Sequence, residues 1–334
     1  GQKQRLITAS TLAMGQKIVI LDEPLANLDT AGAEMLMSTL KSLAKAGYCI
    51  VVIEHRLDVV LPFVDKVFHV GGKRVREMKD KESYLKEQSV EISDSCAVFC
   101  GGQPVFSLSD VAFSVKDRVI LNGVAFDISK GSRTVLFGEN GCGKTTLLRL
   151  ISRLEKPTRG VILQNISGKF GQKSKQSKKW YKKVGVVYQN PDYQLFMPTV
   201  EKEIKFGAKS DEYADEIAEK FGVKHLYVRH PQSLSGGQKR RVSIAAVVAT
   251  APEVLILDEP TVGQDYKGLC EMTEILNRIH EETKNTMITV THDKRCAAAL
   301  CDRAVWIKDG KVRKTGGKEL AEEFFKDPTG NAKN

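Results

Sequence analysis

Short apolar runs along the chain predict strands that are buried on both faces. Mostly apolar runs of four residues occupy 134–137, 254–257 and 287–290, a length that fits strands better than helices. Behind the first run, apolar residues recur at helical spacing and predict an amphipathic helix. They are Leu147, Leu148, Leu150, Ile151 and Leu154. A Gly-rich segment separates the run from the helix, so a strand–loop–helix unit is expected over residues 132–154.

The chain also contains two copies of one sequence unit. The matching segments are 1–29 with 237–265, 51–56 with 289–294, and 65–75 with 302–312. The last pair predicts in each copy a strand, a Gly turn and a second strand. The first copy therefore corresponds to only the C-terminal third or so of the unit.

The composition of the segment between the two copies predicts a linker and thereby the domain boundaries. Residues 78–104 are rich in charge, have few large apolar residues in their first half and end in Gly-Gly-Gln-Pro, which predicts a linker. Residues 1–77 are then the C-terminal part of a first domain, 105–325 a complete second domain and 326–334 a tail. We expect the sequence to be part of a longer tandem protein in which about 130 residues precede Gly1.

Charge, cysteine content and hydropathy narrow the class of protein. No apolar run approaches the roughly 18 residues that span a bilayer. If the protein acts at a membrane, we expect it to do so as a peripheral subunit. The seven cysteines are scattered, which favours reduced thiols in a cytosol. The formal net charge of +10 fits a phosphate-rich ligand, a nucleic acid or an anionic membrane and does not choose among them.

The Gly-rich segment 138–145 reads GENGCGKT and matches the phosphate-binding pattern G-x4-G-K-T. Glycines let successive N–H groups converge on phosphate oxygens, and the helix N-terminus adds partial positive charge. Lys144 is expected to reach the β- and γ-phosphates, Thr145 to coordinate Mg2+ and Thr146 to donate to a phosphate. The residues expected to hold the nucleotide here are Gly138, Glu139, Asn140, Gly141, Cys142, Gly143, Lys144, Thr145 and Thr146.

Carboxylates and a histidine follow the other two predicted strands. Asp258 is expected to hold Mg2+, and Glu259 to orient or deprotonate the attacking water. His292 follows the strand at 287–290 and suits a group that senses the γ-phosphate. The first copy repeats these three residues as Asp22, Glu23 and His55.

With these residues assembled, the second copy resembles the ATP-binding-cassette (ABC) ATPases. Its segments resemble that family's Walker A motif (138–146), Q-loop glutamine (Gln189), signature LSGGQ (234–238), Walker B motif (254–260), D-loop (262–265) and switch histidine (His292). In the first copy the matching residues are Gly1 and Gln2 of a signature, Asp22 and Glu23, the D-loop at 27–29, and His55. The resemblance implies an α/β P-loop NTPase fold with a parallel-sheet core, an antiparallel β subdomain and a helical signature subdomain.

The resemblance also implies a mechanism with ATP and Mg2+ as cofactors. Two cassettes meet head to tail, and each ATP lies between the Walker motifs of one and the signature of the other. The signature residues are Ser235, Gly236, Gly237 and Gln238, and on the first copy Gly1 and Gln2. Catalysis would fall to Glu259, His292 and Gln189, with Glu23 and His55 in the first copy; Thr145, Gln189, Asp258 and Asp22 would hold the metal. Because its first signature is incomplete, this chain is expected to bind ATP and turn it over slowly.

A finer resemblance concerns residues 189–204. The string QNPDYQLF followed by TVEKEI is similar to the ATPases of energy-coupling-factor (ECF) importers for vitamins and transition-metal ions. It implies membrane-embedded partners, a transmembrane coupling component and a substrate-binding component, with this chain peripheral on the cytoplasmic face. The apolar cluster of Tyr193, Leu195, Phe196 and Met197 is predicted to dock on them; the alternative is that these residues are core.

Two other interpretations stay open. A soluble twin-cassette ATPase acting on ribosomes or nucleic acid is favoured by the basic segment 170–185, where Trp180 and Tyr181 offer stacking surfaces; a solvated loop or hairpin explains the same segment, and we expect no nucleic-acid partner. The other is a scaffold that binds nucleotide without hydrolysis.

One position departs from the family's pattern. The aromatic residue on which the family stacks adenine corresponds here to Val115, with Phe113 two residues away, and this departure implies weak base selectivity.

Overall fold

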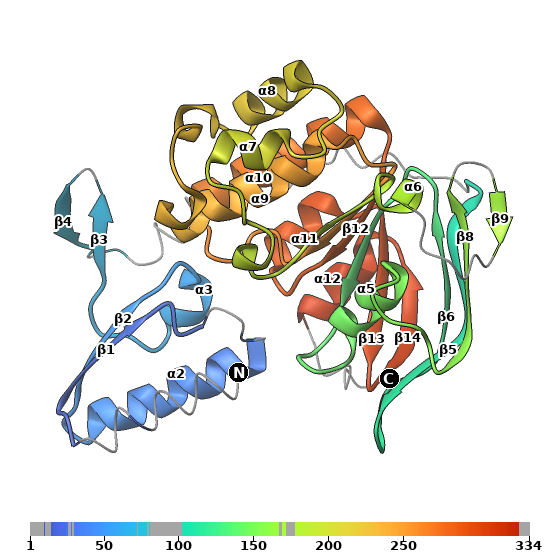
Figure 1. Cartoon of the computed structure of the whole chain (residues 1–334). Coiled ribbons are helices and arrows are strands. Elements are labelled where there is room, and N and C mark those ends of the chain that lie inside the picture. Colours follow the sequence, from blue (N-terminus) through green and yellow to red (C-terminus); the bar gives the residue numbers. More distant parts are fainter. Residues whose placement is uncertain are drawn as a thin grey trace. The chain divides into compact units, whose positions relative to one another are not determined.

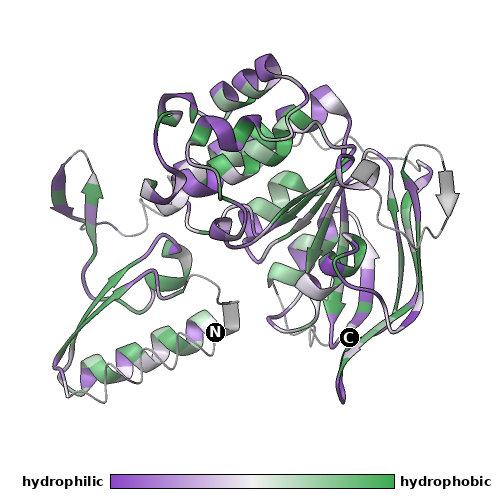
Figure 2. Cartoon of the chain, viewed as in Figure 1, coloured by the Kyte–Doolittle hydropathy of each residue, from purple (hydrophilic) through white to green (hydrophobic). Residues whose placement is uncertain are grey.

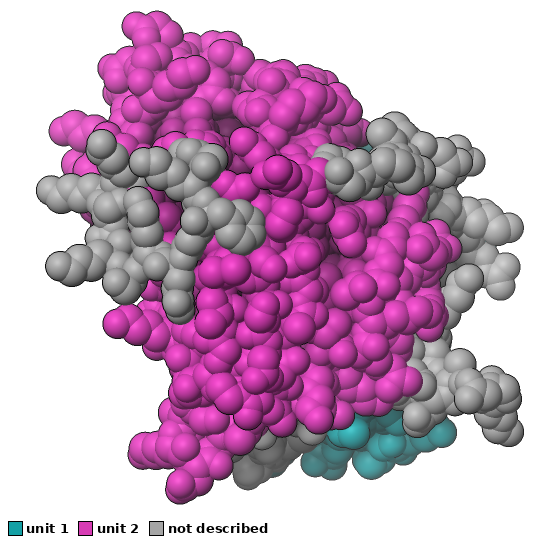
Figure 3. Space-filling view, turned by 90° about the vertical axis from the view of Figure 1, so that its right-hand side faces the viewer, with its two compact units in different colours: residues 1–91, 262–266 teal, residues 92–261, 267–334 magenta. Residues whose placement is uncertain are grey.

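The structure is a computed structural model of the 334-residue chain. It describes residues 10, 15–25, 28, 30–71, 73–78, 80, 102–166, 169–171 and 178–326. The chain divides into two compact units, one of residues 1–91 with 262–266 and one of residues 92–261 with 267–334 (Figures 1 and 3). The predicted signature residues Gly1 and Gln2, and Asn27 and Asp29 of the first D-loop, lie outside the described residues.

The second unit is built around a six-stranded sheet in the order β10-β11-β12-β7-β13-β14. Its strands are β7 (Arg133–Phe137), β10 (Val184–Val187), β11 (Val254–Asp258), β12 (Thr286–Val290), β13 (Arg303–Lys308) and β14 (Lys311–Gly316). Neighbouring strands are parallel except for β14, which runs antiparallel to β13. Every residue of β7, β11 and β12 is buried, and Figure 2 shows these strands as largely hydrophobic. The strands predicted from the apolar runs are confirmed.

Helices cover both faces of this sheet because its strands have no polar face to leave in water. The helices of the second unit are α5 (Lys144–Ile151), α6 (Lys178–Tyr181), α7 (Val200–Lys205), α8 (Asp211–Lys220), α9 (Gly236–Ala249), α10 (Tyr266–Thr283), α11 (Lys294–Leu300) and α12 (Lys318–Lys326). Of these, α7 and α8 pack mainly on α9 rather than on the sheet. On one face Ile256 and Ile288 pack with α5, and on the other Leu255, Leu257 and Met287 pack with α9 and α10.

Helix α5 ends at Ile151, and Leu154 is 41% exposed, so the prediction that Leu154 continues the helical stripe is wrong. The backbone of Arg153 turns to a φ of 58°, which interrupts the helical path.

A separate antiparallel sheet completes the predicted β subdomain. Its order is β6-β5-β8-β9, with β5 (Pro104–Val115), β6 (Arg118–Ser129), β8 (Arg159–Ile166) and β9 (Lys169–Gly171). Strand β5 begins at the last residue of the predicted linker. Trp180 packs into the core beside this sheet, and its Nε1 donates to Gln164 Oε1 at 2.7 Å. Because that ring is 92% buried, it does not offer the stacking surface that the nucleic-acid interpretation needs.

The helical subdomain links β10 to the signature through α7, α8 and three 3-10 turns. The turns are η1 (Pro191–Tyr193), η2 (Lys224–Leu226) and η3 (Pro231–Ser233). Side-chain oxygens cap the N-termini of α7 and α8: Thr199 and Ser210 each accept a hydrogen bond from a backbone N–H in the first turn. Such caps satisfy N–H groups that a helix cannot satisfy itself.

The first unit repeats part of this architecture. A two-stranded parallel sheet, β1 (Ile18–Asp22) with β2 (Cys49–Ile53), packs one face on α2 (Thr30–Lys45). A short helix α3 (Leu57–Val60) and the antiparallel hairpin β3 (Phe68–Gly71) and β4 (Arg74–Glu77) follow. The other face of the β1–β2 sheet is open, with Ile18 64% and Ile20 66% exposed. The aligned residues in the second unit, Val254 and Ile256, are fully buried.

A buried charged network fastens β7 to the start of β13. The Arg133 guanidinium donates to both Asp302 oxygens, at 2.5 to 3.1 Å, and to Asn277 Oδ1 at 2.7 Å. Both charged side chains are at most 10% exposed, so removing one partner leaves the other charge buried and uncompensated.

Asp302→Ala is therefore expected to lower the free energy of unfolding by about 3–5 kcal/mol. Urea denaturation followed by circular dichroism measures it. Glu323→Ala is the matched control, because Glu323 pairs with Lys314 where both side chains are about half exposed, and it should cost about 1 kcal/mol or less. Equal losses in the two variants would contradict this account of the network.

Candidate functional site

The loop between β7 and α5 forms a cradle of backbone that only glycine allows. Gly138, Gly141 and Gly143 have φ values of 153°, 84° and 105°, a region that L side chains rarely adopt. A Cβ on Gly138 would collide with the Ile307 carbonyl and lie 2.8 Å from Cys142 Sγ. The close packing and the positive φ values thus require glycine at these positions, as the phosphate-binding pattern predicts.

Lys144 is the first residue of α5 and lies inside this loop. It is 7% exposed, and its Nζ donates to the carbonyls of Gly138 at 2.7 Å and Glu139 at 2.9 Å. No side chain caps the N-terminus of α5. A cation beside an uncapped helix start favours an anion, and phosphate oxygens fit this arrangement.

Asp258 ends β11 beside the loop, and its surroundings fit a divalent cation. It is 6% exposed, and its Oδ1 has no hydrogen-bond partner among the described residues. Burial, together with the neighbouring Glu259 carboxylate, raises the pKa of Asp258 to about 6, while Arg240, Lys144 and a bond from Thr145 oppose the shift. A buried carboxylate oxygen without a partner, near a threonine hydroxyl, is the donor set that Mg2+ prefers. The residues present therefore fit Mg2+ with a nucleotide.

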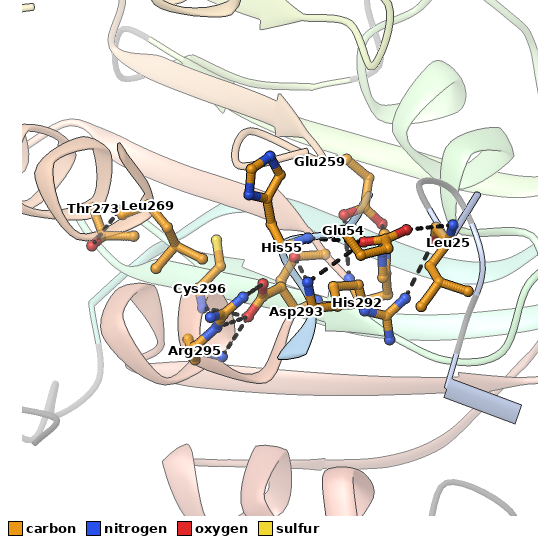
Figure 4. A network of polar contacts seen from close by, with 12 residues as sticks. Leu25, Glu54, His55, Glu259, Leu269, Thr273, His292, Asp293, Arg295 and Cys296 are labelled. Carbon is orange, nitrogen blue, oxygen red and sulfur yellow. Dashed lines mark hydrogen bonds and ion pairs between the residues drawn. The ribbon is translucent and has the colours of Figure 1, made fainter. Parts of the chain in front are cut away.

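Glu259 and His292 form a tight pair at the ends of β11 and β12 (Figure 4). His292 Nδ1 lies 2.7 Å from Glu259 Oε1, and the His292 N–H points to Oε2 at 3.3 Å. Glu259 has a φ of 52°, a strained conformation of the kind often found at functional sites. Asp293 fixes the next turn by capping α11 and pairing with Arg295 at 2.8 Å.

The first unit reproduces this pair in a more open form. Glu23 has a φ of 44°, its N–H donates to Ile53 O at 2.9 Å, and His55 Nε2 lies 3.4 Å from its Oε1. The N–H of Glu259 likewise donates to the carbonyl of Val290, at 2.9 Å. The first pair is about 40% exposed, against about 10% in the second unit, and Asp22 is also exposed. The aligned residues thus share a geometry but not the same burial.

The Q-loop segment follows β10. The Gln194 side chain stabilises this segment with two hydrogen bonds. It accepts from the Tyr188 N–H at 2.9 Å and donates to the Val186 carbonyl at 2.8 Å. The carbonyls of Tyr188 and Gln189 accept from Arg240, a buried residue of α9. Sequence reasoning missed Gln194 and Arg240, because neither belongs to a motif whose chemistry can be argued from spacing.

The signature residues start α9 and are partly open to solvent. Ser235 and Gln238 form a capping box, with N–H to oxygen distances of 3.3 and 3.1 Å. Ser235 and Gly236 are exposed, and a Cβ on Gly236 would meet nothing within 4 Å. The structure therefore gathers Lys144, Thr145, Asp258, Glu259 and His292 around one loop. It leaves the signature as a separate exposed helix start.

A groove of about 230 Å³ lies between the Q-loop segment and the helical subdomain. Phe196 and Phe206 line it with ring centroids 5.5 Å apart and are 67% and 58% exposed. Of the predicted apolar cluster, Tyr193 is 78% exposed and Leu195 is buried. The cluster thus contributes partly to the core and partly to the surface.

Comparisons with known proteins agree with this geometry. The sequence profile described as "ABC transporter" matches residues 121–262. A curated relative, "Putative HMP/thiamine import ATP-binding protein YkoD" of Bacillus subtilis, is 31% identical over a match that covers 92% of this chain and 63% of that protein. The chain thus spans just under two thirds of that relative's length.

Two solved structures are similar to the second unit's cassette. CbiO1 from Clostridium perfringens, part of the ABC transporter complex cbiONQ, is 31% identical with a TM-score of 0.58, covering 67% of this chain and 91% of that one. The cassette MJ0796, a dimer in a post-hydrolysis state bound to ADP and Pi, is 26% identical with a TM-score of 0.56, covering 64% and 98%. The chain belongs to the ABC transporter family, whose cassettes bind ATP with Mg2+ and hydrolyse it. Among the described helices, none has the length and apolarity to cross a bilayer.

The sequence predicts Val115 at the position where the family stacks adenine, and Val115 is 49% exposed at the end of β5. Val115→Tyr is expected to tighten ATP binding about tenfold, since stacking a base on an aromatic ring contributes roughly 1–3 kcal/mol. Equilibrium titration with a fluorescent ATP analogue measures it. Val119→Tyr is the control: Val119 pairs with Ser114 across the hairpin, so it points to the opposite face from Val115. A gain from Val119→Tyr as large as that from Val115→Tyr would refute the assignment.

Proposed function

We propose that this chain is the ATP-binding and hydrolysing subunit of an ECF-type importer that takes up a vitamin or a transition-metal ion. The observation that carries the proposal is the buried Glu259–His292 pair beside the Lys144 loop. The names of relatives linked to thiamine import and to the cbiONQ complex support the importer class.

In the proposed mechanism, Lys144 and the loop N–H groups would hold the phosphates, while Thr145, Asp258 and Gln189 would hold Mg2+. The bound metal would neutralise charge on the phosphates. Glu259, which is 6% exposed, would accept the proton of the attacking water. His292 holds the Glu259 carboxylate through Oε1 and would sense the γ-phosphate of a bound ATP.

Coupling to transport would use the exposed signature. Ser235 to Gln238 would close an ATP held by the phosphate loop of a partner cassette. ATP then joins the cassettes in the closed state, and loss of the γ-phosphate lets them part. Glu23 and His55 would serve the first cassette's own site, with Asp22 on its metal.

The groove at Phe196 and Phe206 is the proposed contact with the membrane-embedded subunits, at the cytoplasmic face. Aromatic rings that are more than half exposed beside a hollow are unusual on a surface that meets only water. A buried Glu203 accepts from the N–H groups of Phe196 and Met197, at 2.9 and 2.7 Å, and so fixes the loop that presents them. A preformed apolar surface favours docking of a partner helix.

Glu259→Gln is expected to lower the ATP hydrolysis rate at least about 100-fold, because an amide cannot take the proton. Steady-state phosphate release measures the rate, and titration of the same variant should show unchanged ATP affinity. Glu253→Gln is the control, since Glu253 pairs with Lys183 on the surface, where both are about one third exposed. ATP binding without measurable turnover in the parent would favour the scaffold alternative. Turnover in Glu259→Gln equal to a measurable parent rate would contradict the role given to Glu259.

Phe196→Asp is expected to cut cosedimentation with membranes of the source cells about fivefold, because a charge in the groove opposes docking. Val228→Asp, at an 88% exposed position outside the groove lining, should pellet like the parent protein. Cosedimentation of the parent with ribosomes instead of membranes would support the soluble twin-cassette alternative.

A further inference from the structure

Arg240 is a buried cation whose role no motif explains. It stands just past the first turn of α9, two residues after the last residue of the signature, and is 2% exposed. A guanidinium is rarely buried unless its donors are used. What it bonds to is therefore informative.

Two of its donors go to the Q-loop backbone. Nη1 donates to the Tyr188 carbonyl at 2.7 Å, and Nη2 donates to the Gln189 carbonyl. A planar fork with fixed donors can hold two successive carbonyls at once, whereas an ammonium is a single point of charge. The backbone on both sides of the Gln189 Cα is fixed in this way to the helix that carries the signature.

A second contact supports the same connection. Lys239, the preceding residue of α9, donates to Asp192 Oδ1 at 2.8 Å in turn η1. Two consecutive basic residues thus join α9 to residues 188–192. The Asp258 and Glu259 carboxylates also act on the Arg240 charge: burial lowers the pKa of Arg240 to about 10, and the two carboxylates oppose that shift. Arg240 therefore remains a cation at neutral pH.

We propose that Arg240 is a positioning residue that sets the placement of Gln189 toward bound Mg2+ and makes that placement follow the signature helix. The inference rests on the proposed function, in which Gln189 holds the metal. It adds a physical connection between the two motifs, since a shift of α9 would have to carry the carbonyls of Tyr188 and Gln189 with it or break their hydrogen bonds to Arg240.

The competing explanation is that Arg240 only stabilises the core. The two explanations differ in what depends on Mg2+. A core residue affects binding of every nucleotide alike, whereas a residue that positions Gln189 affects only the part of the affinity that Mg2+ contributes.

The experiment uses the full chain carrying Glu259→Gln, so that ATP is not consumed. Dissociation constants are measured for ATP with Mg2+ and for ATP in EDTA, and their ratio is the gain from the metal. Arg240→Met is expected to lower that gain about tenfold, the usual order for loss of charge-assisted hydrogen bonds, with affinity in EDTA changed less than about twofold. Arg240→Lys should recover part of the gain.

Arg241→Met is the matched control. Arg241 is the next residue of α9, and it pairs with Glu271 of α10 at 2.6 Å. It should leave the gain from Mg2+ unchanged.

A double-mutant cycle with Gln189→Ala supplies the second test. If Arg240 acts through Gln189, the double variant loses no more of the gain than Gln189→Ala alone. Additive losses, or equal losses with and without Mg2+, would overturn the proposal. Absence of ATP binding by the parent would overturn the proposed function, whereas intact binding with full Mg2+ dependence in Arg240→Met would overturn only the role of Arg240.

Discussion

Two carboxylates at the end of a strand buried along its whole length are the constraint on which the rest of the cassette depends. Strand β11 contributes no polar side chain before Asp258, so helices must cover it on both faces. Asp258 and Glu259 then stand side by side at 6% exposure, where two negative charges repel and lack water. Two cations, Lys144 of α5 and Arg240 of α9, oppose this repulsion at Asp258. His292 adds a hydrogen-bond contact to Glu259 from the end of β12.

This arrangement explains which features the sequence reveals. The loop glycines, Lys144 and the carboxylates are recognisable because their chemistry depends on neighbours within a few residues. The strands are recognisable because burial on both faces leaves continuous apolar runs. The pairing of His292 with Glu259 was foreseeable in outline, since both follow parallel strands and recur in the first copy.

Other features depend on residues far apart in the chain and left no local signal. Arg240 looks like one basic residue in a basic stretch, and only its packing against Tyr188 and Gln189 distinguishes it from Arg241. Trp180 lies among lysines in the sequence, as a surface residue would. In the structure its ring is buried, and its Nε1 donates to Gln164. Leu154 continues a helical spacing that the backbone abandons at Ile151. In each case tertiary packing overrides the local pattern.

The open face of the β1–β2 sheet has a practical consequence for work with this chain in solution. Ile18, Ile20, Val51 and Ile53 are 45–66% exposed on adjacent parallel strands. An exposed, apolar sheet surface of this kind favours association with other chains. Self-association at raised protein concentration would arise from this face without any help from nucleotide. Concentration-dependent light scattering of this polypeptide would therefore be no evidence that its ATP sites had paired.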